Sequence, residues 1–360
     1  MNVAYLLPQI PVVDVRDGGP VRHALEGRAR ALALRDDCLA WFPGPAAPLL
    51  PMLDAVARRW LTGSRSPYLA EITTIAACLG FPGIWFLNGS YQWGCTTLAR
   101  EEGGVPWLAR TLDWPFPGLG RHAEVARLRG PAGDFFSVSW PGYVGALTAM
   151  APGRFAAAVN QAPLFRRTSH RWLRPIDLAA NAIGTWRQRH IPPDQLLRET
   201  FETCATFAEA RRHLETAPIA RPVIYTLVGC EARERCVIER TEEEFATSME
   251  ATCAANDWMP RRAGWEGRIS ATKLFKCTFE GAAEASRARR DALAGWRDEL
   301  ARGDFAWVTP PVLNPYTRLA VTMCAANGTL RMAGYEIVDG AELPQPVTQV
   351  REITPELVAA

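Results

Sequence analysis

The amino-acid sequence predicts an α+β protein in which helices and antiparallel strands form stacked layers. Three features of the 360-residue chain support this fold class. Residues 20–94 carry apolar residues at helical spacing. From Cys95 onward, short apolar or alternating runs are separated by turns, and helices then return before a second set of strands. Strands grouped in this way form antiparallel sheets, whereas a doubly wound fold alternates single strands with single helices.

The N-terminal quarter of the chain predicts helices at residues 23–34, 48–61 and 68–79. In the last of these, Ile72, Ile75 and Leu79 recur at the three-four spacing of a buried helical face. Phe81-Pro82-Gly83 ends that pattern, and the apolar run that follows at 84–91 fits either a helix or a strand.

The rest of the chain alternates groups of strands with groups of helices. Strands are predicted at 105–112, 124–128, 135–140, 146–149 and 155–160, followed by helices at 175–187, 193–204 and 207–214. Further strands are predicted at 223–228 and 236–239, then a charged helix at 281–300 and a final hairpin at 319–324 and 329–335. The hairpin turns at Asn327-Gly328, a pair that favours tight turns, and residues 340–360 are expected to form an irregular tail.

Composition excludes several classes of protein. The net charge is +2, and the arginines are scattered, so no concentrated basic face for nucleic acid is expected. No apolar run approaches the roughly 18–20 residues that span a bilayer. The first residues lack a basic segment and are interrupted by Pro8 and Pro11, which argues against a signal peptide, so the expected location is the cytoplasm.

The cysteines and histidines do not form a metal-site pattern. The nine cysteines include no Cys-x-x-Cys pair and no Cys/His cluster of zinc-site spacing, so most are expected to be small buried residues without disulfides. The five histidines stand in no recognisable Cys-His context, and a papain-type mechanism therefore finds no support.

Cys95 is the candidate nucleophile. It follows Gly94 at the junction between the helical and the strand-rich regions; taken alone, it reads more readily as a buried structural cysteine. A hairpin turning at Gly103-Gly104 would bring Arg110 and Asp113 back beside it. A nearby cation lowers the pKa of a thiol, which would activate Cys95. Taken alone, Arg110 and Asp113 fit a surface ion pair equally well.

Motifs around Cys95 resemble those of a known enzyme family. Gly94-Cys95-Thr96-Thr97, followed by Arg110-Thr111-Leu112-Asp113-Trp114, resembles the choloylglycine hydrolase group and its relatives acid ceramidase and N-acylethanolamine acid amidase. Similar blocks follow this order at 68–93, 141–160, 222–240, 255–268 and 313–323, so the resemblance covers residues 68–335. The Cys95–Arg110 spacing is one residue shorter than is usual in the group, and Thr111 stands where asparagine is frequent, which leaves the substrate open.

The resemblance implies an N-terminal-nucleophile (Ntn) hydrolase fold, a four-layer αββα sandwich with antiparallel sheets behind a helical pro-segment. It also implies self-cleavage between Gly94 and Cys95 into a helical piece, 1–94, and a catalytic piece, 95–360. Cys95 would then supply both a thiol nucleophile and an α-amine, which titrates near 7.7–8 and replaces a histidine as general base.

The same resemblance assigns roles to the other site residues. Asp113 would hold the Cys95 ammonium, and Arg110 would fix Asp113. The Asn256 side chain and the Asn160 backbone amide would form the oxyanion hole; taken alone, both asparagines are ordinary turn residues. Arg268 would brace Asn256 or take part in self-cleavage.

The predicted function is hydrolysis of a linear amide, an N-acyl amide with an apolar acyl chain of the ceramide, N-acylethanolamine, bile-salt or N-acyl-amino-acid type. No metal or organic cofactor is implied. The expected partner is this small-molecule substrate and not nucleic acid. The helices around residues 41–61 are expected to contact membrane surfaces transiently, and the sequence leaves room for a homo-oligomer. Tryptophans near the site, such as Trp93 and Trp114, are expected in the core first and in an acyl pocket second.

Two alternative functions remain. Acyltransferases of penicillin biosynthesis share Gly-Cys-Thr-Thr behind a helical pro-segment, but they usually lack the arginine three residues before the aspartate, so Arg110 argues against them. A non-catalytic, lipid-binding relative is the other alternative. Cleavage before Cys95 distinguishes it from a hydrolase.

Overall fold

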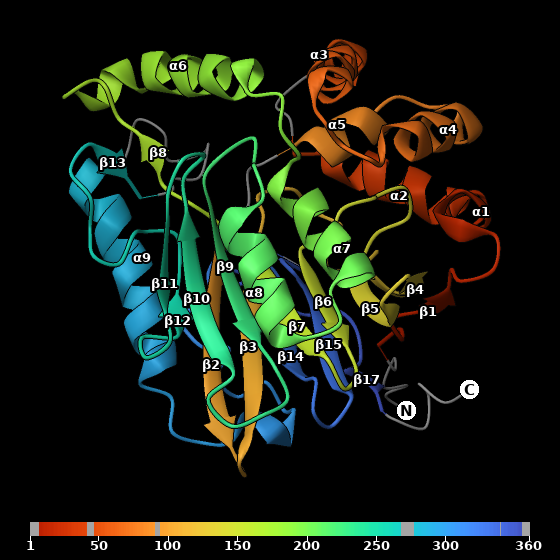
Figure 1. Cartoon of the computed structure of the whole chain (residues 1–360). Helices are drawn as coiled ribbons and strands as arrows, with labels where there is room; N and C mark the ends of the chain where they lie inside the picture. Colours follow the sequence, from red (N-terminus) through yellow and green to blue (C-terminus); the bar gives the residue numbers. More distant parts are fainter. Residues whose placement is uncertain (1–6, 42–46, 91–93, 268–276, 339, 355–360) are drawn as a thin grey trace.

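The computed structural model describes residues 7–41, 47–90, 94–267, 277–338 and 340–354, and every structural statement below concerns these residues. Two β-sheets lie face to face, with helices covering their outer faces (Figure 1). The predicted α+β sandwich with four αββα layers is confirmed.

The first sheet has eight strands in the order β1-β4-β5-β6-β7-β9-β10-β11. The strands are β1 (Val12–Asp14), β4 (Glu124–Gly130), β5 (Gly133–Ser139), β6 (Thr148–Ala151), β7 (Phe155–Gln161), β9 (Val223–Val228), β10 (Arg235–Arg240) and β11 (Phe245–Ser248). Neighbouring strands are antiparallel except for β1 and β4. Helices α7 (Pro193–Thr203) and α8 (Phe207–Thr216) cover its outer face.

The second sheet is built around the strand that begins beside Cys95. Its order is β12-β2-β3-β14-β15-β16, with β17 paired to β15. The strands are β2 (Gly94–Glu102), β3 (Val105–Asp113), β12 (Cys253–Ala254), β14 (Thr317–Cys324), β15 (Thr329–Glu336), β16 (Gln345–Pro346) and β17 (Arg351–Ile353). Helix α9 (Phe279–Ala294) covers the outer face over β2 and β12.

The β2–β3 hairpin confirms the predicted turn at Gly103-Gly104. Both glycines have positive φ, +60° and +81°, as a two-residue turn of the twist-matched type requires. The resulting register sets Cys95 opposite Leu112 and Thr97 opposite Arg110. Because directly opposed residues of an antiparallel pair project to the same face, these four side chains share one face of the sheet.

That shared face is turned toward the first sheet. Cys95 and Leu112 belong to the main core between the sheets together with Val159 of β7. The opposite face of the hairpin carries Leu98 and Ala109, which pack beneath α9 and the segment that follows it. The alternation of side chains along β2 therefore places the candidate nucleophile between the two sheets.

The N-terminal helices gather at one end of the sandwich (Figure 1). They are α1 (Gly19–Glu26), α2 (Arg28–Leu39), α3 (Leu50–Gly63), α4 (Leu69–Leu79) and α5 (Ile84–Gly89). The helix predicted at 23–34 is in fact two helices that meet at Gly27, a residue with low helix propensity. The undecided run from residue 84 is helical.

Buried ion pairs attach these helices to the sheets. Glu124 of β4 is fully buried, forms an ion pair with Arg30 at 2.5 Å and contacts Nε2 of His23 at 2.6 Å. Glu71 of α4, another of the N-terminal helices, pairs with Arg198 of α7 at 2.6 Å. Because a buried charge that loses its partner is strongly destabilising, these pairs hold the N-terminal helices in one position.

The C-terminal tail differs from the sequence expectation. The C-terminal tail contributes β16 and β17 to the edge of the second sheet, because an open sheet edge leaves backbone groups that an added strand pairs. Helix α6 (Arg174–Arg187) runs across the top of the molecule, apart from both sheets (Figure 1). Among the described helices, none has the length and apolar character needed to cross a membrane.

Candidate active site

Cys95 lies at the start of β2 with its side chain fully buried between the sheets. Its Sγ atom is 2.6 Å from Nη2 of Arg110 and 3.4 Å from the carbonyl oxygen of Val159. Its backbone N–H donates to Oδ1 of Asn256 at 2.9 Å. Three of the predicted site residues are thus in direct contact.

Arg110 is fully buried beside that thiol. Besides Cys95, its guanidinium donates to the carbonyls of Leu147 and Val159 at 2.5 and 3.3 Å, and to the hydroxyl of Thr148. Among the residues that the structure describes, none of its hydrogen-bond acceptors is a carboxylate. A buried cation whose partners are neutral favours a negative charge that develops nearby, and Sγ of Cys95 is in direct contact with it.

Asp113 does not contact Arg110, which corrects the predicted role of Arg110 in fixing it. The two residues are three positions apart on β3, and an odd spacing on a strand sends their side chains to opposite faces. The Asp113 carboxylate instead accepts hydrogen bonds from Nδ2 of Asn314 at 2.8 Å and Oγ1 of Thr317 at 3.0 Å. The strand register still sets Asp113 opposite Gly94, beside the predicted cleavage bond.

Asn256 is held by four hydrogen bonds. Its Oδ1 accepts from Cys95 and from Nη2 of Arg289, each at 2.9 Å, and its Nδ2 donates to the carbonyl of Gln161 at 2.8 Å. Its backbone N–H donates to Oγ of Ser286 at 2.9 Å. Contacts from β2, β7 and α9 therefore fix the orientation of the Asn256 side-chain amide.

Asn160 supports the site from β7 through its side-chain amide. Its side-chain amide donates to Oγ1 of Thr97 at 3.2 Å and to the carbonyls of Ala254 and Ala255 at 3.3 and 3.1 Å. Asn160 thereby ties β7 to the residues that lead into Asn256. The role assigned to its backbone amide in an oxyanion hole stays a prediction.

Arg289 of α9 is a site residue that the sequence did not reveal. Besides Asn256, it contacts Oγ1 of Thr96 through Nε at 3.2 Å. Burial lowers the pKa of the Arg289 guanidinium, while the nearby charges of Asp113 and Cys95 act in the opposite direction. It makes the contact with Asn256 that was predicted for Arg268, a residue that lies outside the described part of the chain.

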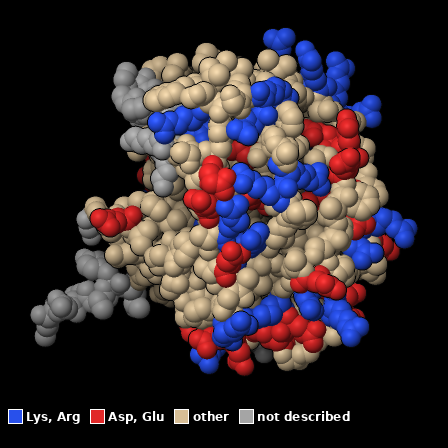
Figure 2. Space-filling view, turned by 90° about the vertical axis from the view of Figure 1, so that its left-hand side faces the viewer, with Lys and Arg blue, Asp and Glu red and all other residues tan. Residues whose placement is uncertain are grey.

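No sequence signal separates Arg289 from its neighbours on α9. Arg287 and Arg290 make surface ion pairs with Glu280 and Asp291, and only the packing of α9 on β2 turns Arg289 inward. The face of the molecule on the α9 side carries basic and acidic groups interspersed (Figure 2).

A groove with a volume of about 660 Å³ is connected to the nucleophile through two hydrogen bonds, one from Cys95 to Asn256 and one from Asn256 to Gln161. Gln161, whose carbonyl accepts from Asn256, lines it. Its apolar walls come from α3 and α6, with Leu53, Val56, Trp60, Leu178, Ala182 and Trp186 among the lining residues. Charged residues, including Arg221 and Glu242, line another part.

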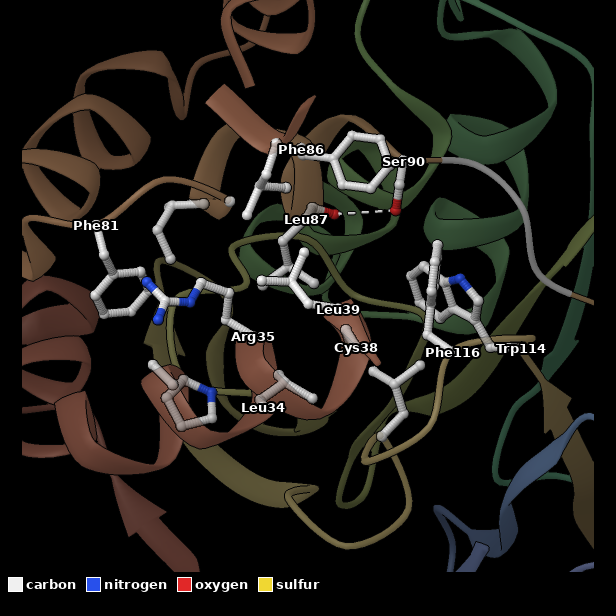
Figure 3. Close-up of a pocket in the computed structure, with 16 residues that line it drawn as sticks. Leu34, Arg35, Cys38, Leu39, Phe81, Phe86, Leu87, Ser90, Trp114 and Phe116 are labelled. Atoms are coloured by element: carbon white, nitrogen blue, oxygen red, sulfur yellow. Dashed lines mark hydrogen bonds between the residues drawn. The ribbon is translucent and has the colours of Figure 1, made fainter. Parts of the chain in front are cut away.

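A smaller apolar pocket of about 60 Å³ shares Phe86 with the groove, since this residue lines both cavities. Figure 3 shows Phe86, Phe116 and Trp114 meeting on one side of it, opposite Phe81 and Arg35. Trp114 directly follows Asp113 and is both a core residue and a pocket residue, whereas Trp93 lies outside the described residues. Within the described ranges, no group of three or more His, Cys, Asp or Glu side chains is placed to bind a metal ion.

No protein-family model matches the chain. The chain is 26% identical over 185 residues to the N-acylethanolamine-hydrolyzing acid amidase of Oryctolagus cuniculus, covering 49% of this chain and 48% of that protein. It is 28% identical over 182 residues to the Mus musculus enzyme of the same name, covering 48% and 47%. It thus spans about half the length of these curated relatives.

Among solved structures, the Caenorhabditis elegans N-acylethanolamine-hydrolyzing acid amidase ortholog matches 64% of this chain and 93% of its own, with 18% identity and a TM-score of 0.44. The curated similarities bear out the resemblance to N-acylethanolamine acid amidase, one of the relatives that the sequence motifs indicated.

The carboxyl of Glu239, which contacts the loop after Asn256, titrates at a different pH in the folded and in the unfolded chain. This buried carboxyl of β10 accepts a hydrogen bond from the Met259 N–H at 2.6 Å, and burial raises its pKa to about 7. Between about pH 4.5 and 7 the unfolded chain ionises here while the folded chain stays protonated, so folding becomes less favourable as pH rises.

We expect Glu239→Gln to remove this pH dependence while keeping an acceptor for Met259. The free energy of unfolding of the wild type should fall relative to the variant by about 3 kcal/mol between pH 4.5 and 8, measured by urea titration. The exposed control Glu243→Gln should track the wild type. A constant difference between Glu239→Gln and wild type across this range would contradict the assignment.

Proposed function

We propose that this chain is a cysteine amidohydrolase that becomes active by cutting its own bond between Gly94 and Cys95. The observation that carries the proposal is the 2.6 Å contact between the buried guanidinium of Arg110 and Sγ of Cys95. The hydrogen bond from the Cys95 N–H to Asn256 supports it, because it orients the nitrogen that cleavage would free. The sequence similarity to amidases agrees with this chemistry.

Self-cleavage needs no group beyond the chain and water. The thiolate of Cys95 attacks the carbonyl carbon of Gly94, forming a C–S bond. The C–N bond then breaks, and the nitrogen takes up a proton, which leaves a thioester and a free α-amine on Cys95. Water hydrolyses the thioester to the Gly94 carboxylate and the Cys95 thiol, separating residues 1–94 from 95–360.

The mature site would repeat this chemistry on a substrate amide. The α-amine takes the thiol proton, and the thiolate attacks the substrate carbonyl. Asn256 has a second N–H on Nδ2 beyond the one bonded to Gln161, and this N–H is the proposed donor to the oxyanion. The leaving amine receives a proton from the α-ammonium, and water then releases the acid from the acyl-enzyme.

The groove supports an apolar acyl chain as the part of the substrate that is recognised. Leu53, Val56 and Trp60 of α3 line it together with Leu178 and Ala182 of α6. Burial of each CH₂ group contributes about 0.8 kcal/mol, so a long chain would bind far more tightly than a short one. The relatives named for N-acylethanolamine hydrolysis favour an N-acyl amide as substrate class.

Exposed apolar side chains on and beside the helices that line this groove support contact with a lipid surface. On α6 and the turn before it, Trp172, Ile176 and Ile183 are more than half exposed, at 61%, 56% and 52%. On the adjacent α3, Met52 and Val56 are 56% and 47% exposed. An apolar rim of this kind suits an enzyme whose substrate leaves a membrane.

The mass of the purified chain tests self-cleavage. We expect two polypeptides, 1–94 and 95–360, that stay associated in native mass spectrometry because the Glu124 and Glu71 ion pairs join them. Cys95→Ala should stay in one piece and be inactive, whereas Cys236→Ala, at another buried cysteine, should be cut normally. An uncut wild type that hydrolyses no N-acyl amide would refute the proposal.

Arg289→Met should lower kcat/KM for an N-acyl amide by about 10- to 100-fold, since a hydrogen bond from a charged group contributes about 1.5–3 kcal/mol. The matched control Arg287→Met removes a surface ion pair two residues away and should change kcat/KM less than twofold. Equal effects of the two substitutions would show that Arg289 does not orient Asn256.

Vesicle binding tests the apolar rim. We expect the double substitution Trp172→Ser and Ile176→Ser to reduce co-sedimentation with phosphatidylcholine–phosphatidylglycerol vesicles at least fivefold. The control Ile337→Ser removes an exposed apolar residue beyond the end of β15 and should bind as the wild type does. Undiminished binding of the double variant would exclude this surface.

A further inference from the structure

Asp113 is a buried carboxylate on β3 with an exposed fraction of 2%. Among the residues that the structure describes, its hydrogen-bond donors are Asn314 and Thr317, both neutral, and no ion pair reaches it. The guanidinium groups of Arg289 on α9 and Arg318 on β14 act on it only at longer range. A buried carboxylate with neutral partners favours a positive charge that arises beside it.

Strand pairing sets Asp113 in one row across three adjacent strands, β2, β3 and β14 (Figure 1). Gly94 of β2 is its partner on one side, and Thr317 of β14 is its partner on the other. Opposed residues project to the same face, so Thr317 reaches Asp113 from its side, whereas Gly94 has no side chain to fill the other. The nitrogen that cleavage would free belongs to Cys95, the residue next to Gly94.

A bulge in β14 decides that Thr317 takes this position. The register shifts between Thr317, which opposes Asp113, and Leu319, which opposes Leu112, so Arg318 is the extra residue. In a regular ladder Arg318 would stand opposite Asp113. Its guanidinium instead donates to the carbonyl of Phe116 at 2.8 Å. The bulge thus places a neutral donor beside Asp113 and keeps the nearest cation of the strand away.

Backbone groups orient both donors. The Thr317 hydroxyl oxygen accepts the Asn314 N–H at 3.0 Å, so its single proton can donate to Oδ1 of Asp113, also at 3.0 Å. Oδ1 of Asn314 accepts the Tyr316 N–H at 3.1 Å, which directs its Nδ2 to Oδ2 of Asp113 at 2.8 Å. Each carboxylate oxygen therefore receives one fixed hydrogen bond and keeps lone pairs for a further donor.

We propose that Asn314 and Thr317 are positioning residues, which hold the Asp113 carboxylate ready for the α-ammonium that cleavage would create on Cys95. In each turnover the proton moves from the Cys95 thiol to its α-amine, and the fixed carboxylate stabilises the ammonium that results. Neither residue needs to touch the substrate. This role rests on the proposed amidohydrolase function, whereas the hydrogen bonds themselves do not.

Steady-state kinetics of the cleaved protein on an N-acyl amide test this role. Thr317→Val keeps the shape of the side chain but loses the hydroxyl, and it should lower kcat about 10- to 100-fold with KM unchanged, because a hydrogen bond to a charged group is lost. Thr317→Ser, which keeps the hydroxyl, should restore kcat. The matched control Thr322→Val removes a buried hydroxyl of the same strand that has no hydrogen-bond partner among the described residues, and it should leave kcat at the wild-type value.

Asn314→Asp adds a measurement that a purely structural role would not change. It keeps the acceptor for the Tyr316 N–H but sets a second carboxyl against Asp113, so it can donate to Asp113 only when the two share a proton. Its kcat relative to that of the wild type should therefore rise about tenfold from pH 8 to pH 5, the range over which such a pair gains its proton.

An equal loss of kcat by Asn314→Asp at both pH values would overturn the inference. So would a Thr317→Ser variant as impaired as Thr317→Val, or a Thr322→Val variant impaired to the same extent. If Thr317→Val stays uncut, restored self-cleavage in Thr317→Ser supports the role and its absence contradicts it. A wild type that neither cuts itself nor hydrolyses an N-acyl amide would instead count against the proposed function.

Discussion

The buried guanidinium of Arg110 is the constraint on which the site depends. A cation between two apolar sheets is tolerated only when hydrogen bonds replace its hydration. Arg110 finds these at the Leu147 and Val159 carbonyls of the opposite sheet, at Thr148, and at the thiol of Cys95. The spacing of the sheets, the register of the β2–β3 hairpin and the environment of the thiol are therefore coupled, because a shift in any of them would leave the charge without its acceptors.

A polar strip crosses the otherwise apolar core next to this cation. Thr97 of β2 shares a 2.7 Å hydrogen bond with Thr226 of β9 and accepts from Asn160 of β7. Asn160 in turn holds the segment that presents Asn256. Buried polar groups stabilise a structure only when they are satisfied together, so this strip restricts the two sheets to one alignment. The same alignment brings the Cys95 backbone nitrogen within hydrogen-bonding distance of Asn256.

The N-terminal helices serve two different roles. Their ion pairs with Glu124 and Arg198 fix them against the sheets, and their apolar faces form a core cluster of their own. Yet α3 also contributes the exposed and groove-lining apolar residues that an acyl chain would contact. These helices are thus tightly attached at their inner side and apolar at their outer side.

Local chemistry alone determined the hairpin, since Gly103-Gly104 sets its turn and strand alternation then places Arg110 on the face of Cys95. The helical faces of 68–79 and the main strands follow from periodicity in the same way. The partners of Asp113 and the inward orientation of Arg289 were decided by tertiary structure. Asn314 and Thr317 reach Asp113 through strand pairing some 200 residues away, and Arg289 reaches Asn256 only through the rotation of α9 on β2. Such contacts depend on how whole elements pack, and no local pattern carries that information.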